Sequence, residues 1–150
     1  MTARAVLDVK VLVSGVLGLG LGRTTPPVIA LITALQREYV LVASPPLLDE
    51  FHAVLQRPRF ALGTDLATQW AELIGSVADV VPAQGRLHIL KRDPADNTIL
   101  ECALRGRAES LVTGNLRHFE EPRSEKHGEI TYRGVRVVTP RGFVRAVLGR

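Results

Sequence analysis

The chain has 150 residues, 46% of them hydrophobic and 23% charged, which is ordinary for a soluble globular protein and fits one domain over residues 1–150. Its one cysteine, Cys102, excludes an internal disulfide and fits a reducing, cytoplasmic compartment. The net charge of +4 comes entirely from residues 101–150, which hold ten basic and six acidic side chains. Such a segment either attracts phosphate backbones or is simply a solvated surface.

The first expected element is an apolar strand, Ala5–Leu7, which ends on the carboxylate of Asp8. The apolar residues around Asp8 predict a central strand that is covered on both faces. An isolated charge is costly in such a place unless it is paired or binds a metal. Because ligands of open α/β sheets bind outside the carboxyl ends of the strands, Asp8 is the first candidate site residue.

An apolar, glycine-rich segment follows at residues 11–22, where we expect a short helical turn and then a flexible loop. The glycines of this segment are Gly15, Gly18, Gly20 and Gly22. Their spacing does not match the G-x-G-x-x-G dinucleotide fingerprint, which argues against a Rossmann-like small-molecule binder. A transmembrane helix needs about 20 apolar residues, so we predict neither a membrane span nor a signal peptide.

Helices and strands then alternate along the chain. Caps and apolar periodicity predict helices at 26–37, 45–56, 64–77 and 94–105, a helical turn at 116–119 and a terminal helix after Thr139-Pro140. Strands are expected at 39–43, 79–81, 110–113 and 135–138, with polar connections at 84–92 and 120–132, the latter mobile. This alternation predicts an α/β fold, a three-layer sandwich with a central, mainly parallel sheet flanked by helices.

Further polar residues stand out on these elements. Glu50 shares a helix face with apolar neighbours and is expected to border the buried stripe, although pairing with an arginine at the stripe's edge would explain it equally. Asp93 and Asp96 open a later helix, where capping and the helix dipole explain either acid alone. Thr113 and Asn115 lie at the end of a buried strand.

Five segments, in this order and at this spacing, resemble the PIN domain family, and in particular the PIN-type toxins of bacterial toxin–antitoxin systems. They are Val6–Ser14, Ser44–Glu50, Arg92–Asn97, Leu111–Asn115 and Val137–Pro140. The resemblance covers nearly the whole chain. It implies a PIN-like parallel sheet and metal-dependent cleavage of RNA, with RNA, a cognate antitoxin and a second copy of the chain as partners.

The resemblance also implies a set of site residues. Asp8, Glu50 and Asp96 would be the catalytic acids and, with Asn115, the metal ligands, while Thr113, Asp93, Lys10 and Ser14 would support them. Oxygen ligands suit Mg²⁺ or Mn²⁺. Three crowded carboxylates repel one another, so a bound cation and the acid cluster would stabilise each other.

Two residues depart from the family pattern. Lys10 stands where asparagine is common, and Asn115 stands where a fourth acid is common. Both changes make the pocket less negative, which predicts weakened metal binding unless Lys10 contacts a substrate phosphate instead. The sequence therefore leaves two readings open: a metal-dependent endoribonuclease with RNA on its basic last third, or a catalytically impaired module that binds RNA or a partner protein.

Overall fold

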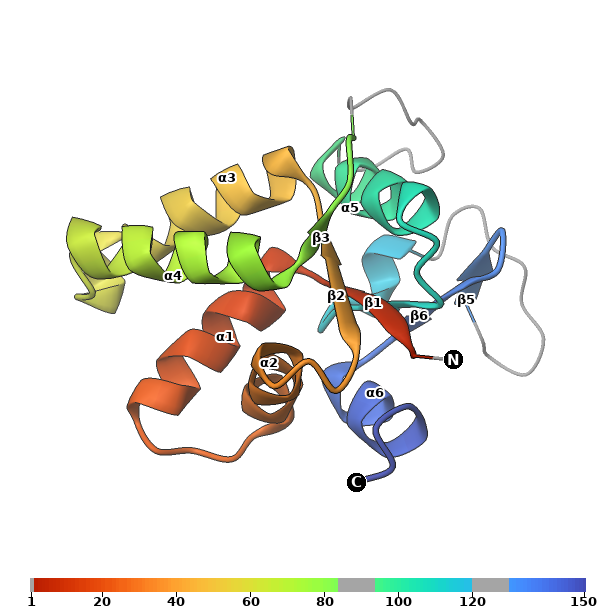
Figure 1. The fold of residues 1–150 in the computed structure, drawn as a ribbon, viewed down its shortest axis with the longest axis horizontal. Coiled ribbons are helices and arrows are strands. Elements are labelled where there is room, and N and C mark those ends of the chain that lie inside the picture. Colours follow the sequence, from red (N-terminus) through yellow and green to blue (C-terminus); the bar gives the residue numbers. More distant parts are fainter. Residues whose placement is uncertain (1, 84–93, 120–129) are drawn as a thin grey trace.

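The computed structural model describes residues 2–83, 94–119 and 130–150, and these residues form a six-stranded sheet flanked by helices (Figure 1). The strands are β1 Arg4–Leu7, β2 Val40–Ala43, β3 Asp79–Val80, β4 Ser110–Val112, β5 Ile130–Tyr132 and β6 Val135–Val138. They lie in the order β3-β2-β1-β4-β6-β5, and every neighbouring pair is parallel except β5 with β6. The predicted α/β sandwich with a mainly parallel sheet is confirmed.

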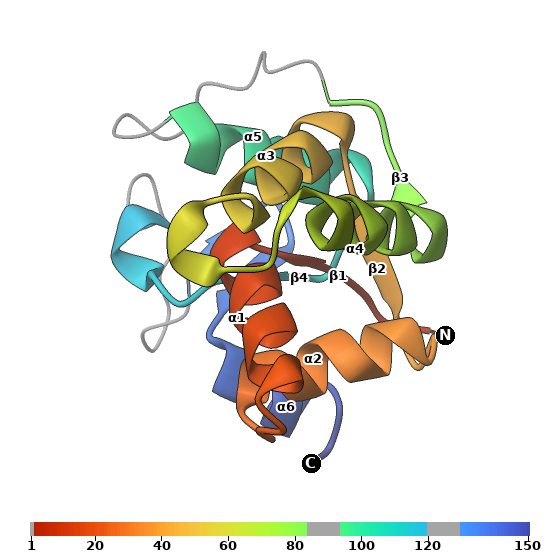
Figure 2. The same ribbon diagram turned by 90° about the vertical axis from the view of Figure 1, so that its left-hand side faces the viewer.

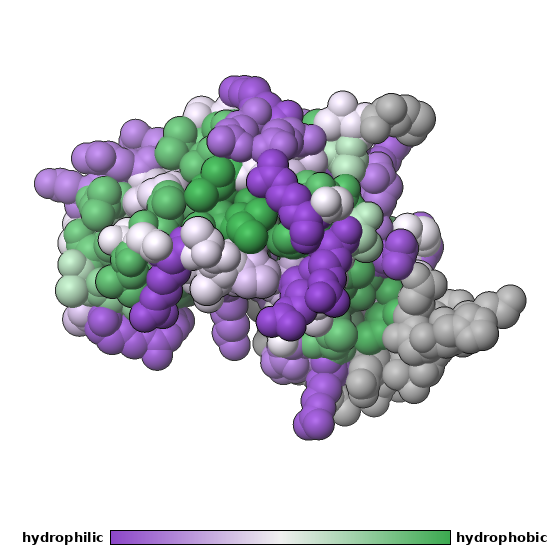
Figure 3. Space-filling view, turned by 90° about the horizontal axis from the view of Figure 1, so that it is seen from below, coloured by the Kyte–Doolittle hydropathy of each residue, from purple (hydrophilic) through white to green (hydrophobic). Residues whose placement is uncertain are grey.

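Helices cover both faces of the sheet. They are α1 Val9–Gly20, α2 Pro26–Leu35, α3 Pro45–Leu55, α4 Thr64–Val77, α5 Pro94–Arg105 and α6 Pro140–Ala146, with short 3-10 helices η1 Pro58–Phe60 and η2 Leu116–Phe119. Helices α1, α2 and α6 lie on one side of the sheet and α3 and α5 on the other, while α4 packs along α3 (Figures 1 and 2). The face formed by α1, α2 and α6 shows apolar areas separated by hydrophilic side chains (Figure 3).

Hydroxyl caps and prolines set the starts of several helices, as the sequence predicts. The Ser44 hydroxyl accepts a hydrogen bond from the Leu47 backbone N–H before α3, over 3.4 Å. The Thr139 hydroxyl does the same for the Gly142 N–H before α6, over 3.0 Å. Proline then occupies the first turn of each helix, where its missing N–H costs nothing.

Helix α1 replaces the expected glycine loop. A Cβ built on Gly15 would lie 2.9 Å from the Pro27 carbonyl oxygen, and one on Gly18 would lie 2.6 Å from Val28 Cγ2. These glycines therefore let α1 approach α2 closely, and the prediction of a flexible loop from Gly15 onward was wrong. The helix ends at Gly20, and Gly22 follows with a φ of +70°.

The end of the segment expected to be a polar, mobile connection is a strand, because β5 covers Ile130–Tyr132. The remainder of that segment, 120–129, and the loop at 84–92 with Asp93 lie outside the described residues. Within the described ranges, no helix is long and apolar enough to cross a membrane.

The central strands place the candidate residues. Leu7 of β1 pairs in register with Val112 of β4, and both are fully buried. Because the two strands are parallel, the residues that follow this pair, Asp8 and Thr113, emerge side by side at the carboxyl edge of the sheet.

Candidate functional site

A pocket of about 330 Å³ opens at this edge of the sheet. Charged and polar side chains from five segments line it: Asp8, Lys10, Ser14, Glu50, Arg57, Arg59, Asp96, Asn115 and His118. The three acids that the sequence singles out thus face one cavity although they are far apart along the chain. They come from the end of β1, from α3 and from the first turn of α5.

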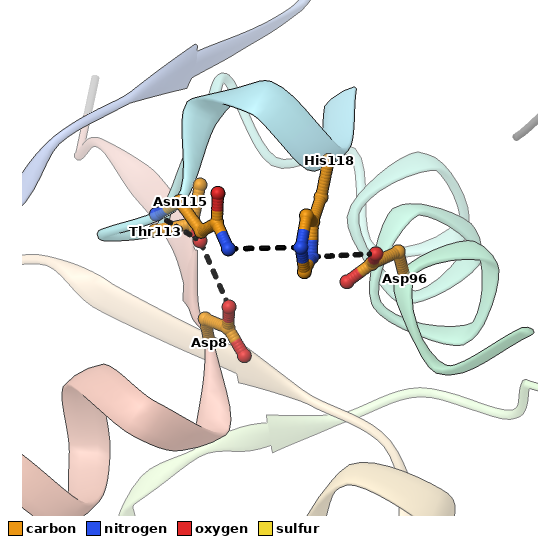
Figure 4. Close-up of polar contacts among 5 residues, drawn as sticks. All are labelled: Asp8, Asp96, Thr113, Asn115 and His118. Atoms are coloured by element: carbon orange, nitrogen blue, oxygen red, sulfur yellow. Dashed lines mark hydrogen bonds and ion pairs between the residues drawn. The ribbon is translucent and has the colours of Figure 1, made fainter. Parts of the chain in front are cut away.

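Asp8 occupies the N-cap position of α1, yet its side chain makes no capping hydrogen bond. Its Oδ2 instead accepts a hydrogen bond of 2.8 Å from the hydroxyl of Thr113 (Figure 4). Its main chain is held by β4, because the Asp8 N–H donates to the Val112 carbonyl over 2.9 Å. Helix capping therefore does not account for this carboxylate, which is only partly buried and lines the pocket.

Thr113 connects two other site residues. Its side chain is fully buried, and its hydroxyl accepts a hydrogen bond from the Asn115 backbone N–H over 3.2 Å while donating to Asp8. One hydroxyl thus fixes the Asp8 carboxylate and the start of the turn after β4. This position suits the supporting role that the resemblance implies for Thr113.

Asp96 lies in the first turn of α5 and is only 6% exposed. Its Oδ2 is 3.1 Å from Nδ1 of His118, and Nε2 of the same imidazole is 2.9 Å from Nδ2 of Asn115. Figure 4 shows Asp8 and Asp96 approaching one space from opposite sides, with His118 and Asn115 beside it. When the Asn115 amide donates to Nε2, the imidazole carries its proton on Nδ1, the nitrogen that faces Asp96.

Glu50 is more exposed than the sequence suggests. The buried residues of α3 are Leu47, Phe51 and Leu55, whereas Glu50 lies on the exposed side of that stripe and lines the pocket. The expectation that Glu50 borders the buried stripe and not the solvent face was therefore wrong, because the residue is exposed, although it lines the pocket.

Helix α1 contributes Lys10 and Ser14, which are one turn apart, exposed and in the pocket lining. Lys10 thus lines the same pocket as the acids, and whether its charge weakens metal binding stays a prediction. Arg57 and Arg59 also line the pocket. The described pocket lining therefore holds three carboxylate side chains and three lysine or arginine side chains, whose formal charges balance.

Sequence reasoning missed His118, Arg57 and Arg59. The i, i+3 spacing of Asn115 and His118 in a predicted helical turn is a usable signal, because residues so spaced share a face. Arg57 and Arg59 lie beyond the end of α3 at Leu55, so helical spacing gives no comparable signal for them. Asp93, the remaining candidate, lies outside the described residues.

The donor set fits a hard divalent cation in its chemistry. Carboxylate and amide oxygens surround one cavity, and Mg²⁺ commonly takes one or two carboxylates and keeps several waters. The described residues contain no group of three or more His, Cys, Asp and Glu side chains gathered closely enough to hold a metal ion. An open, partly hydrated site fits this arrangement, whereas a closed cage of protein ligands does not.

Fold and pocket together define an α/β protein with acidic side chains at the carboxyl edge of its central strands. A model of the PIN domain matches residues 4–117, and the chain therefore belongs to the PIN domain family. This match confirms the fold that the sequence predicts, and it indicates a nuclease-type fold. The chain has no significant match among curated proteins.

Proposed function

We propose that this protein is a Mg²⁺- or Mn²⁺-dependent endoribonuclease of the PIN toxin type. The observation that carries the proposal is the convergence of Asp8, Glu50 and Asp96 on one pocket from three separate segments. PIN domains generally use divalent metals and commonly bind RNA or antitoxin partners, which supports the same reading.

In this proposal Asp8, Glu50 and Asp96 hold the ion partly through bound waters, because the three acids are not gathered closely enough to ligate it together, and the Asn115 side-chain carbonyl is a further oxygen donor. The ion, when bound, neutralises charge on the substrate phosphate and activates a water for in-line attack. Thr113 fixes the orientation of Asp8 through its hydrogen bond, and the His118 imidazole lies 3.1 Å from the Asp96 carboxylate. Ser14, on the pocket wall, is available to hydrogen-bond a substrate oxygen.

A catalytically impaired module that binds RNA or a partner protein is the second candidate. Lys10 favours it, because an ammonium group in the pocket lining repels a divalent cation. The contact between Asp96 and His118 also favours it, because an imidazole already engages one oxygen of a proposed ligand.

We also propose that residues 1–150 act as one PIN domain in the cytoplasm, as a homodimer inhibited by a cognate antitoxin. This part of the proposal rests on the family alone. Copurification of the protein with a small inhibitory partner from its source cells, and the mass of the complex in solution, test it directly.

RNA cleavage separates the two candidates. End-labelled single-stranded RNA is incubated with Mn²⁺ and wild type, Asp8→Asn or Glu50→Gln protein. Asp49→Asn is the matched control, since Asp49 is an exposed carboxylate next to Glu50 that is not among the described pocket residues. The nuclease proposal expects cleavage by wild type and the control and background cleavage by the other two. RNA binding without cleavage by any of the proteins supports the impaired module.

Metal binding tests the role of Lys10 separately. We expect Lys10→Asn to bind Mn²⁺ more tightly in calorimetry, because the substitution removes a positive charge from the pocket. Unchanged or weaker affinity would contradict this account of Lys10.

A further inference from the structure

The cations of the described pocket lining come from the first 60 residues of the chain. Lys10, Arg57 and Arg59 line the pocket, whereas the described lining includes no lysine or arginine from residues 101–150. Neither arginine forms an ion pair with any described residue. Two guanidinium groups are therefore available to a ligand beside the proposed catalytic acids.

Arg59 has a specific neighbour. Its guanidinium carbon lies 4.8 Å from the centroid of the Phe60 ring, within the range of a cation–π contact. Phe60 is partly buried and packs against the hydrophobic core, whereas Arg59 is exposed. The aromatic ring thus anchors a planar, charged group that a ligand can reach.

The local backbone holds this pair in a defined turn. Pro58 begins η1 with its fixed φ, and Ala61 ends it in the left-handed region with φ of +54°. Arg57, which directly precedes η1, lines the same pocket as Glu50 of α3. An extended ligand bound at η1 would therefore reach the pocket wall that carries Glu50.

We propose that Arg57, Arg59 and Phe60 form a nucleotide platform that binds single-stranded RNA next to the acids. Arg59, supported by Phe60, stacks on a nucleobase, and Arg57 contacts a neighbouring phosphate. Arginine planes and aromatic rings are common stacking partners of unpaired bases, and guanidinium groups match phosphate oxygens. The proposal rests on the proposed nuclease function, which sets the direction of the RNA toward the acids. Such a platform would select unpaired RNA, because bases within a duplex are already stacked.

The test measures binding without cleavage. Fluorescence anisotropy in EDTA follows a labelled single-stranded RNA and an abasic oligonucleotide of the same length. Arg59→Lys keeps the charge but loses the plane, Phe60→Leu removes the ring beneath it, and Arg57→Gln removes a charge. The matched control is Arg145→Gln, because Arg145 is an exposed arginine of the basic last third, on α6, and is not in the described pocket lining.

We expect Arg59→Lys and Phe60→Leu to weaken binding of the RNA at least about fivefold, since base stacking contributes about that much or more. Binding of the abasic oligonucleotide changes less than twofold in both variants, because it offers no base. Arg57→Gln weakens both ligands and lowers the salt dependence of binding by about 0.7, the value for one contact to a single-stranded phosphate. Arg145→Gln binds both ligands as the wild type does.

Several results would overturn the platform. Wild-type affinity of Arg59→Lys for the RNA, or an equal loss on both ligands, removes the stacking role. A loss in Arg145→Gln as large as in Arg57→Gln places RNA on the last third instead, and no RNA binding by wild type ends the proposal. Because Phe60 is partly buried, its variant is interpreted only if its melting temperature matches the wild type, and Arg59→Lys otherwise decides.

The outcome also separates the platform from the nuclease. If the protein does not cleave RNA but its binding depends on these residues as expected, the platform proposal stands and the nuclease proposal fails. If the protein cleaves RNA but its binding does not depend on Arg57 and Arg59, the nuclease proposal stands and the platform proposal fails.

Discussion

The Nδ1 atom of His118 lies 3.1 Å from Oδ2 of Asp96, so an imidazole on η2 holds a nearly buried carboxylate on the first turn of α5. The same ring reaches Asn115, at the position where the family commonly has an acid. His118 therefore joins two proposed metal ligands through protein contacts alone.

Replacing His118 tests how much this contact contributes to stability. His118→Ala removes the imidazole whose Nδ1 lies 3.1 Å from the Asp96 carboxylate, whose side chain is 8% exposed, and the loss of a polar partner by a buried group costs about 1–3 kcal/mol. We expect the free energy of unfolding in urea to fall by that amount. His118→Gln restores an N–H donor and should recover part of it. Equal stability of the wild type and the alanine variant would contradict this role.

Metal binding should stabilise the fold if the pocket acids hold an ion. A ligand that binds only the folded state adds about 2.7 kcal/mol at a concentration of 100 times its dissociation constant. We therefore expect the melting temperature of the wild type to rise with Mn²⁺ concentration and to return in EDTA. Asp8→Asn should lose this dependence and Asp49→Asn should keep it. A rise of the same size in Asp8→Asn would show that Mn²⁺ binds elsewhere.

Much of the fold follows from local sequence signals, because caps, prolines and apolar runs act where they stand. Residues 11–22 were predicted wrongly because Gly15 and Gly18 are required by close packing against α2. Their neighbours in the sequence do not reveal this contact. Strand β5 was missed for a different reason. It is short and pairs with β6 across Arg133 and Gly134, whose positive φ angles of 51° and 91° form a tight turn.

The candidate site likewise has residues whose positions could be predicted from local sequence and residues whose positions could not. The neighbouring positions of Asp8 and Thr113 could be predicted, because parallel central strands end at one edge of the sheet. The convergence of Glu50 and Asp96 came from the family resemblance, since nothing local fixes how α3 and α5 approach each other. His118 and Arg59 depend on the paths of two short 3-10 helices, which periodicity does not determine.

The two glycine environments on α1 give a matched test of helix packing. A Cβ at Gly18 would lie 2.6 Å from Val28 Cγ2, whereas a Cβ at Gly20 would meet nothing within 4 Å. We expect Gly18→Ala to destabilise the protein by about 1–3 kcal/mol through overpacking. Gly20→Ala should be neutral or stabilising by up to about 1 kcal/mol, because alanine favours the helix. Urea denaturation of both variants measures the difference, and the same effect in both would argue against close α1–α2 packing.

Cys102 gives a prediction at alkaline pH. The thiol is fully buried on α5, and this burial raises its pKa to about 11, with a further rise from the charge of Glu101 and an opposing hydrogen bond from Ser44. A thiol in the unfolded chain titrates near the ordinary pKa of about 8.5. Between these two values the folded state binds more protons than the unfolded state, so stability falls as the pH rises.

Cys102→Ala should remove that dependence. We expect the free energy of unfolding of the wild type to decrease relative to the variant between roughly pH 8.5 and about 11, where the folded thiol titrates. Tyr39, whose pKa burial also raises, adds a further loss above its ordinary pKa of about 10, but it does so equally in both proteins. Urea denaturation at a series of pH values provides the comparison. Parallel curves for the two proteins would mean that Cys102 titrates normally, and rapid reaction of the folded wild type with a thiol reagent at pH 8 would mean that the thiol is accessible.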